Sequence, residues 1–512
     1  MLSIINSFGL VGLNGYLVKV ETDISRGLPS IDVVGLADAS IRESKERVVS
    51  AIKNQGFRSP IEKVTINLAP ADTKKEGSLY DLPISVGILK ASNQINVPKE
   101  ALEQFSFIGE LSLDGSLRKI KGVLPILITA RNLGIKKIVI PYDNKAEAGF
   151  IKGVEAYPVH NLREVVEFLN GTVHILPVEN ISYELVRQQS RAIGDFALIK
   201  GQASSKRALE ISAAGGHNVI LIGPPGSGKT MLAKAFPSIL PDMSFEEALE
   251  VTKIHSIAGT LDSKTGILAE RPFRSPHHTA TTVALMGGGT KAKPGEISLA
   301  HNGVLFLDEL PEYPRHTIEA LRQPLEDGVI AVSRNMQSVE YPANFVLIAS
   351  MNPCPCGNYG STTKPCKCSP SQIHKYLSKL SGPLMDRIDM YIEVDGVTYG
   401  DISTVSNEES SKDIKARVDK ARKIQLERYA GTGIFSNSKM RPDMIKKYCK
   451  LSEECNILLG QAFDSLKLSA RAYNRILKVA RTIADLDGSE DIQMDHLVEA
   501  INYRSLDEKY WT

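Results

Sequence analysis

The chain has 512 residues, of which 42% are hydrophobic and 23% are charged, and its formal net charge is +2. This composition is ordinary for a soluble globular protein, and the length predicts about two to four domains. The near-neutral charge neither indicates nor excludes a nucleic-acid partner, because a local basic stripe can lie within a balanced total.

The apolar N-terminus does not have the pattern of a signal peptide. Asn and Gly interrupt its first twenty residues, and its first charged residue is Lys19, whereas a signal peptide needs a basic start and an unbroken apolar core. No other stretch approaches a transmembrane span. Cys449 and Cys455 stand alone in the sequence, which disfavours a secreted disulfide framework. We therefore expect a cytoplasmic protein with no membrane segment.

Residues 1–170 alternate short β-rich runs with helical patterns. The runs "KVTINLAP" and "KKIVIP" predict strands that end at proline. Segment 38–57 places Ile41, Val48, Val49 and Ile52 at helical spacing and has a glycine near its end, which predicts a helix. We expect an α/β or α+β domain over 1–170, followed by a linker over 171–192.

Residues 193–395 contain apolar strands that alternate with helices and loops, which predicts a mostly parallel nucleotide-binding sheet. One strand, "NVILI", runs into "GPPGSGKT", a full G-x-x-x-x-G-K-[ST] motif that precedes a helical pattern. Backbone N–H groups of such a loop surround the phosphates of ATP, the lysine reaches the β- and γ-phosphates, and the threonine binds Mg²⁺. The predicted loop comprises Gly223, Pro224, Pro225, Gly226, Ser227, Gly228, Lys229 and Thr230.

Two further strands of this segment end in polar residues. "GVLFLDEL" delivers Asp308 and Glu309 at a strand end, and "NFVLIASMN" delivers Asn352. We predict that Asp308 lies near Mg²⁺, that Glu309 orients the attacking water, and that Asn352 contacts this water or the γ-phosphate. These residues predict an ATP hydrolase.

A basic, glycine-containing segment lies between the predicted phosphate loop and Asp308. Glycines with basic flanks suit a moving loop that grips phosphates without reading bases. The adjacent His277 and His278 also suit a metal site, but no cysteine or carboxylate is obviously spaced to join them. A predicted hairpin with Arg334–Asn335 at its turn is a second candidate, for which an ordinary solvated basic turn is an equally good interpretation. The basic residues of the first segment are Arg271, Arg274, His277, His278, Lys291 and Lys293.

Four of the six cysteines lie in "CPCGNYGSTTKPCKC", directly after Asn352. Cys354 and Cys356 form one C-x-C pair, and Cys366 and Cys368 form another. Four thiolates from one loop can satisfy tetrahedral Zn²⁺ in a structural role. A flexible loop of reduced cysteines is the alternative.

The remaining residues, 396–512, are predicted to form a charged connector and a helical C-terminal region. "SARAYNRILKVARTIADL" places five residues on one helical face. They are Tyr473, Ile476, Leu477, Ala480 and Ile483.

Taken together, "GPPGSGKT", "GVLFLDELPE", "IASMNPCPCG", "SGPLMDRIDMYIEV" and the helix pattern above resemble AAA+ ATPases of the magnesium-chelatase-like ComM/YifB family over nearly the whole chain. The resemblance implies an α/β fold with a Lon-protease-like α+β domain, a parallel-sheet P-loop core and a C-terminal helical lid. It implies that Asn352 is sensor 1, Arg387 the arginine finger and Arg471 the sensor 2 arginine, and that the subunits form a hexameric ring. From the residues alone, Arg387 suits a structural ion pair with Asp386 or Asp389 equally well.

The leading domain resembles the catalytic fold of Lon protease, which also occurs in the RadA recombination ATPase. Ser78 lies near the place of the protease serine but is displaced from its pattern, and Val123 stands where the lysine would be, with Lys119 and Lys121 nearby. A serine without a placed base is only an alcohol. We therefore expect a scaffold or DNA-contacting domain without protease activity.

Three functions follow from these features. The first is an ATP-driven helicase or translocase on single-stranded or branched DNA, which the resemblance links to branch migration in natural transformation or recombination. The second is a magnesium-chelatase-type motor that remodels a protein partner. The third is a scaffold whose ATPase activity only drives assembly.

Overall fold

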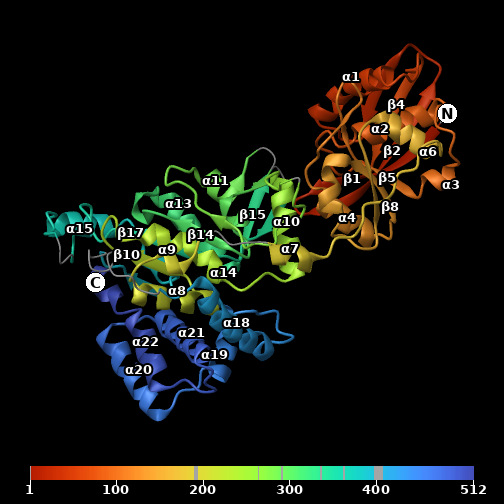
Figure 1. The fold of residues 1–512 in the computed structure, drawn as a ribbon. Coiled ribbons are helices and arrows are strands. Elements are labelled where there is room, and N and C mark those ends of the chain that lie inside the picture. The colour runs from red at the N-terminus through yellow and green to blue at the C-terminus, as the bar shows by residue number, and fades with distance from the viewer. Residues whose placement is uncertain are drawn as a thin grey trace. The chain divides into compact units, whose positions relative to one another are not determined.

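The computed structural model describes residues 2–189, 194–262, 264–289, 292–334, 337–360, 364–396 and 408–511. The sequence predictions about Lys291 and Asn335 fall outside these residues. The chain forms two compact units (Figure 1). The first comprises Met1–Gln189 and Phe245–Ala269, and the second comprises Ser190–Ser244 and Glu270–Thr512.

The first unit is built on a seven-stranded mixed sheet with the order β3-β4-β2-β1-β5-β8-β9. The β1–β2 and β2–β4 pairs are antiparallel, and the other pairs are parallel. Its strands are β1 (Leu2–Val11), β2 (Asn14–Ser25), β3 (Ser30–Val34), β4 (Lys63–Ala69), β5 (Phe105–Phe107), β8 (Lys137–Pro141) and β9 (Glu155–Val159). A small β6 (Glu110–Leu111) and β7 (Leu117–Arg118) pair lies outside this sheet.

The predicted first helix is confirmed as α1 (Ala39–Asn54), and Asp38 caps its N-terminus by accepting a hydrogen bond from the Ile41 N–H. Helix α10 (Phe245–Ala258) also belongs to this unit and packs on α4 (Val123–Asn132). The Ser256 hydroxyl donates to the buried carboxylate of Glu147 at 2.6 Å. The other helices are α2 (Asp81–Ala91), α3 (Lys99–Leu102), α5 (Lys145–Ala148), α6 (Leu162–Leu169) and α7 (Tyr183–Gln189).

The second unit contains the predicted parallel sheet, with the order β11-β14-β17-β10-β18 and every pairing parallel. Its strands are β10 (Val219–Ile222), β11 (Phe273–Arg274), β14 (Val304–Leu307), β17 (Val346–Met351) and β18 (Met390–Glu393). The central strands are almost entirely buried, as expected for a parallel sheet that is covered on both faces. Because the strands are parallel, the carboxyl ends of β10, β14 and β17 meet at one sheet edge.

Helices and two hairpins surround this sheet. The hairpins pair β12 (Gly287–Gly288) with β13 (Lys293–Pro294) and β15 (Val329–Arg334) with β16 (Gln337–Pro342). The helices before β18 are α8 (Ala203–Gly215), α9 (Lys229–Ala235), α11 (Thr282–Met286), α12 (Glu296–Leu299), α13 (Arg315–Ala320), α14 (Arg322–Asp327), α15 (Pro370–Leu377) and α16 (Gly382–Met385).

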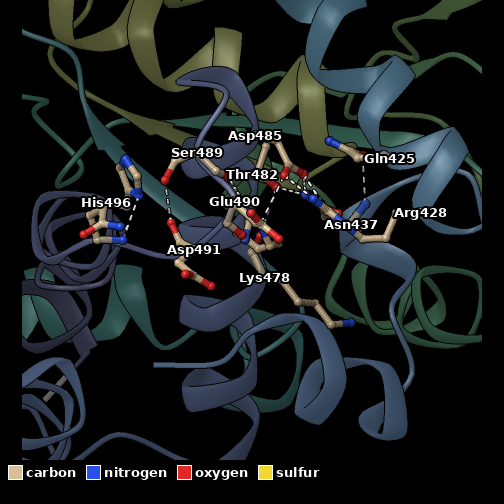
Figure 2. A network of polar contacts seen from close by, with 12 residues as sticks. Gln425, Arg428, Asn437, Lys478, Thr482, Asp485, Ser489, Glu490, Asp491 and His496 are labelled. Carbon is tan, nitrogen blue, oxygen red and sulfur yellow. Dashed lines mark hydrogen bonds and ion pairs between the residues drawn. The ribbon is translucent and has the colours of Figure 1, made fainter. Parts of the chain in front are cut away.

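The C-terminal part of the second unit is helical, as predicted. Helix α21 (Ala470–Leu486) packs against α8, α18 (Ser411–Arg428) and α22 (Met494–Asn502). The shorter or more peripheral helices are α19 (Pro442–Tyr448), α20 (Glu453–Ser465) and α23 (Leu506–Trp511). Beside α21 a buried polar network joins Arg428, Asn437, Thr482 and Asp485 (Figure 2). Within the described parts of the chain, no helix combines the length and apolar character that a bilayer crossing requires.

Candidate active site

The predicted phosphate loop connects the buried strand β10 to helix α9. Gly226 and Gly228 have φ values of +78° and +91°, a backbone conformation that favours glycine. A Cβ at Gly223 would lie 2.2 Å from the Val394 carbonyl oxygen, so the first position of the motif also requires glycine. The loop therefore has the conformation in which successive backbone N–H groups can surround an anion.

Lys229 begins α9, and its ammonium group lies against the loop. It donates to the carbonyl oxygens of Gly223 and Pro224 at 2.7 and 2.8 Å and to Oδ1 of Asn352 at 3.3 Å. Burial lowers the pKa of Lys229 to about 8, and the nearby carboxylates of Asp308 and Glu309 oppose this shift. The structure thus brings together the lysine and the strand-end asparagine that the sequence placed 123 residues apart.

The Mg²⁺ ligands predicted from the sequence, Thr230 and Asp308, are in direct contact. The Thr230 hydroxyl donates to Oδ2 of Asp308 at 2.9 Å. The other oxygen, Oδ1, accepts from the Ser350 hydroxyl and from the Glu309 N–H at 3.1 Å. Sequence reasoning did not select Ser350. The sequence feature that could have identified Ser350 is a polar residue inside the apolar run "VLIASM", which forms the strand that pairs with β14, directly before Asp308.

Glu309 follows Asp308 in the left-handed region, with a φ of +53°, which is unusual for a residue with a side chain. Its carboxylate is 55% exposed, and Oε2 lies 3.8 Å from Nδ1 of His278. The segment before His278 is tied to the turn after Glu309, because the Tyr313 hydroxyl donates to the Pro276 carbonyl oxygen at 2.6 Å. The sequence places His278 among the basic residues of the preceding segment and in a histidine pair that suits a metal site, but it does not indicate the contact with Glu309.

The two predicted arginines, Arg387 and Arg471, line one pocket of about 180 Å³ together with Glu326, Asn474, Arg475 and Lys478. Arg387 forms an ion pair with Glu326 and donates to the Pro383 carbonyl oxygen at 2.7 Å. Its ionic partner is therefore neither of the two aspartates considered from the sequence. Asp389 instead pairs with Arg475.

Arg387 lies at the amino-terminal end of the sheet's strands, whereas the phosphate loop of the same chain lies at their carboxyl-terminal end. Strands β10 and β18 pair in parallel from Val219 opposite Met390 to Ile222 opposite Glu393. Arg387 precedes β18, whereas the loop follows β10. The intervening strand is about 13 Å long at about 3.3 Å per residue. The arginine-lined pocket and the phosphate loop of one chain therefore lie at opposite ends of these strands and do not form a single site.

The four clustered cysteines converge on one point. The Cys354 sulfur lies 3.4 Å from that of Cys356 and 3.7 Å from that of Cys366, and the Cys356 and Cys366 sulfurs are 3.6 Å apart. Including Cys368, all four sulfurs lie within 4.8 Å of one another. A tetrahedral zinc site with Zn–S bonds of about 2.3 Å has sulfur–sulfur edges of about 3.8 Å. The cluster therefore has dimensions that fit such an ion.

Comparison with known proteins agrees with this geometry. The family described as magnesium chelatase, subunit ChlI, matches residues 195–402, and related families of that subunit match 20–144 and 408–504. Competence protein ComM of Haemophilus influenzae is 43% identical over 507 residues, which cover 99% of this chain and 98% of that protein. YifB of Escherichia coli is 45% identical over 511 residues, with 99% and 97% covered. The chain belongs to the ComM/YifB family.

Membership of the ComM/YifB family assigns the second unit to the magnesium-chelatase-like AAA+ ATPases and the protein to the ATPase motors. Two more distant similarities are also found. The magnesium-chelatase 38 kDa subunit of Rhodobacter capsulatus is 26% identical over 184 residues, or 32% of this chain and 52% of that protein. Lon protease 2 of Bacillus subtilis is 28% identical over 182 residues, or 32% of each chain.

In this ComM/YifB member, the candidate protease residues of the first unit have other partners. The Ser78 hydroxyl donates to the Glu110 carboxylate. Lys119 donates to the Leu261 carbonyl oxygen at 3.1 Å and Lys121 to that of Ala258 at 3.4 Å. Val123 is buried at the start of α4. The contacts of Ser78, Lys119 and Lys121 therefore do not form a serine–lysine pair.

In the basic segment before Asp308, Arg271 and Arg274 are bound to other groups of the protein, whereas Lys293 is exposed. Arg271 donates to the carbonyl oxygens of Pro241 and Asn302, each at 2.6 Å, and Arg274 pairs with Glu296 at 2.7 Å. Lys293 is exposed on the short β12–β13 hairpin. The His277 and His278 rings lie 4.1 Å apart. Apart from the cysteines, the described residues contain no cluster of three or more metal-ligating side chains, so these histidines lack the further ligands that a metal site needs.

Proposed function

We propose that this protein is a cytoplasmic ATP-driven motor on DNA, a hexameric helicase or translocase that promotes branch migration during natural transformation or recombination. The observation that carries the proposal is the assembled ATP site on a chain that aligns along nearly its whole length with a competence protein. The motor class follows from the family. The DNA substrate and the ring are the proposed parts.

The residues of the site have complementary roles in ATP hydrolysis. Lys229 exchanges its contacts with the loop carbonyls for the β- and γ-phosphates, and Thr230 and Asp308 would hold Mg²⁺, which would neutralise phosphate charge. The exposed Glu309 carboxylate accepts a hydrogen bond from the attacking water and orients it toward the γ-phosphate. Asn352, already in contact with Lys229, fixes the opposite side of that water.

The position of the arginines supports a ring of identical subunits. Arg387 and Arg471 share one pocket at the opposite sheet edge from their own phosphate loop. Arginines that stabilise charge on the γ-phosphate must therefore act on the nucleotide of a neighbouring subunit. A closed ring gives every nucleotide such a neighbour, and the hexamer is the ring that family membership suggests.

The β12–β13 hairpin is the proposed DNA contact. Its glycines and the exposed Lys293 suit a sequence-independent grip on a phosphate backbone. The chain returns from this hairpin to β14, which delivers Asp308 and Glu309. The hairpin and the water-orienting residue are thus close in the chain, which suits coupling between DNA contact and hydrolysis.

We also propose that Cys354, Cys356, Cys366 and Cys368 hold a structural zinc ion. The sulfur spacing supports this, and four protein ligands leave no open position for chemistry on the metal. Elemental analysis of untagged protein that was purified without chelators should give about one zinc per chain. A Cys366→Ser, Cys368→Ser variant should contain none. Four rapidly titrating thiols in zinc-free wild-type protein would contradict the proposal.

The alternative is a chelatase-type motor that remodels a protein partner, which the magnesium-chelatase family matches favour. The deciding experiment measures ATP turnover with no DNA, with single-stranded DNA and with forked DNA, using Glu309→Gln as the inactive control. The proposed function predicts that DNA raises the rate several-fold and that forked DNA is unwound. A rate that no DNA changes would contradict it and favour the alternative.

A further inference from the structure

The cysteine loop contacts the phosphate loop as well as continuing from the catalytic strand. Gly357 lies so close to Pro225 that a Cβ placed on it would be 2.4 Å from Cδ and 2.8 Å from Cγ of the proline ring. Gly357 has a φ of +78° and directly follows Cys356. The contact therefore joins a residue next to a proposed zinc ligand with the third residue of the phosphate loop.

A second connection lies at the other end of the same turn. The Gly223 N–H donates to the Met351 carbonyl oxygen at 3.2 Å, and Met351 is the last residue of β17. Asn352 follows, and Cys354 is completely buried two residues later. The first residue of the phosphate loop is thus bonded to the strand that enters the cysteine loop, and Pro225 packs on the residue that leaves its first C-x-C pair.

The far side of the cysteine loop is also anchored in the second unit. The loop runs into α15. Ser369 and Gln372 cap the N-terminus of this helix by reciprocal hydrogen bonds, which form a capping box. The Tyr359 ring packs edge-on against Tyr510 at 6.4 Å, and the Tyr510 hydroxyl donates to Glu393 on β18 at 3.1 Å. With these anchors, a bound ion would fix Gly357 from both directions along the chain.

We propose that the metal in the four-cysteine cluster holds the phosphate loop in its nucleotide-binding conformation through the contact between Gly357 and Pro225. This inference rests on the zinc site of the proposed function. The ion acts through packing, since it lies outside the path of the reaction. Loss of the metal frees Gly357, Pro225 loses its support, and the loop binds phosphates less tightly. If the metal acted only through the position of Asn352, its loss would change ATP turnover. The contact between Gly357 and Pro225 predicts that its loss also lowers nucleotide affinity.

A double-mutant cycle separates this contact from metal binding. Gly357→Ala leaves all four cysteines in place but forces a methyl group against the proline ring. Pro225→Ala removes the ring atoms Cγ and Cδ that the methyl group would meet. Gly431→Ala is the matched control, because Gly431 has nearly the same φ of +76° and nothing within 4 Å of its Cβ position. The readouts are zinc per chain and the affinity for a fluorescent ATP analogue without DNA.

We expect Gly357→Ala to retain about one zinc per chain and to lose at least tenfold in nucleotide affinity, whereas Gly431→Ala stays within threefold of wild type. The double variant should recover to within threefold of Pro225→Ala alone. Zinc-loaded Gly357→Ala with wild-type affinity would overturn the inference. So would metal-depleted wild-type protein that binds nucleotide as tightly as the loaded form. Because no DNA is present, a failed DNA stimulation contradicts only the proposed function, whereas zinc-free native protein contradicts the metal site itself.

Discussion

Replacing Asp485 with asparagine should strongly destabilise the second unit, because this carboxylate neutralises two buried arginines. Asp485 lies on α21 and its side chain has no exposed surface. It accepts two hydrogen bonds from Arg428, at 2.8 and 2.5 Å, and one from Asn437 at 2.8 Å (Figure 2). Arg481 donates a further hydrogen bond to it at 3.0 Å. The side chains of Arg428 and Arg481 are themselves only 14% and 3% exposed.

The magnitude follows from what the substitution leaves behind. Asparagine keeps the shape of the side chain but offers one acceptor oxygen and no charge, so Arg428 and Arg481 retain buried positive charge without the carboxylate that they share. Breaking a buried ion pair from one side costs about 3–5 kcal/mol. Two arginines share this one carboxylate, so we expect Asp485→Asn to lower the free energy of unfolding by about 3 kcal/mol or more.

Urea unfolding followed by tryptophan fluorescence measures this effect in the relevant unit. The chain has one tryptophan, Trp511, and it packs against Tyr391 of β18. Asp487→Asn is the matched control two residues along the chain. The Asp487 side chain is 51% exposed and pairs with His496 at 3.1 Å, and such a pair contributes about 0–1 kcal/mol. If the two variants differ by less than about 1 kcal/mol, the network does not stabilise the unit as argued.

Three further outcomes test the ATP site. Lys229→Ala should abolish nucleotide binding, whereas Glu309→Gln should bind ATP with near-normal affinity and hydrolyse it about 100-fold or more slowly; normal turnover by the latter would remove Glu309 from its water-orienting role. Arg387→Ala should bind nucleotide yet lose about 10³-fold or more in turnover. Mixing it with Lys229→Ala subunits should restore activity at hybrid interfaces, and rings without such rescue would make Arg387 structural. His278→Ala should raise DNA-free ATP turnover by up to about fivefold at unchanged affinity, since a partly exposed charge contact worth up to about 1 kcal/mol no longer competes for Glu309; an unchanged rate would show that their contact is incidental.

The ATP site could be predicted from the sequence where its residues are contiguous. The phosphate loop requires glycines at fixed offsets between a strand and a helix, and the acidic pair ends an apolar run. Both patterns are local, and the structure brings Thr230 to Asp308 as those patterns require. The same holds for α21, whose cap at Ser469 and apolar face are local signals.

Contacts between distant segments could not be predicted in this way. His278 and Glu309 are 31 positions apart in the sequence, and only the path of the loop after β11 brings them together. The choice of Glu326 as the partner of Arg387, over adjacent aspartates, depends on where α14 packs. Likewise, nothing in the local sequence of α10 specifies which unit provides the surface on which it packs.

That last helix has a consequence for how the protein is made. The first unit is interrupted in the chain, because its segment Phe245–Ala269 follows the phosphate loop of the second unit. A chain leaving the ribosome must therefore expose about 80 residues beyond Gln189 before the first unit has all its parts, although domains generally fold from the N-terminus as synthesis proceeds. A fragment that begins at residue 190 lacks α4, on which α10 packs, and so uncovers buried apolar residues of α10 such as Val251 and Ile254. Removing residues 1–189 should accordingly give an aggregation-prone ATPase fragment, and the first unit should complete its cotranslational folding only after Ala269 has emerged.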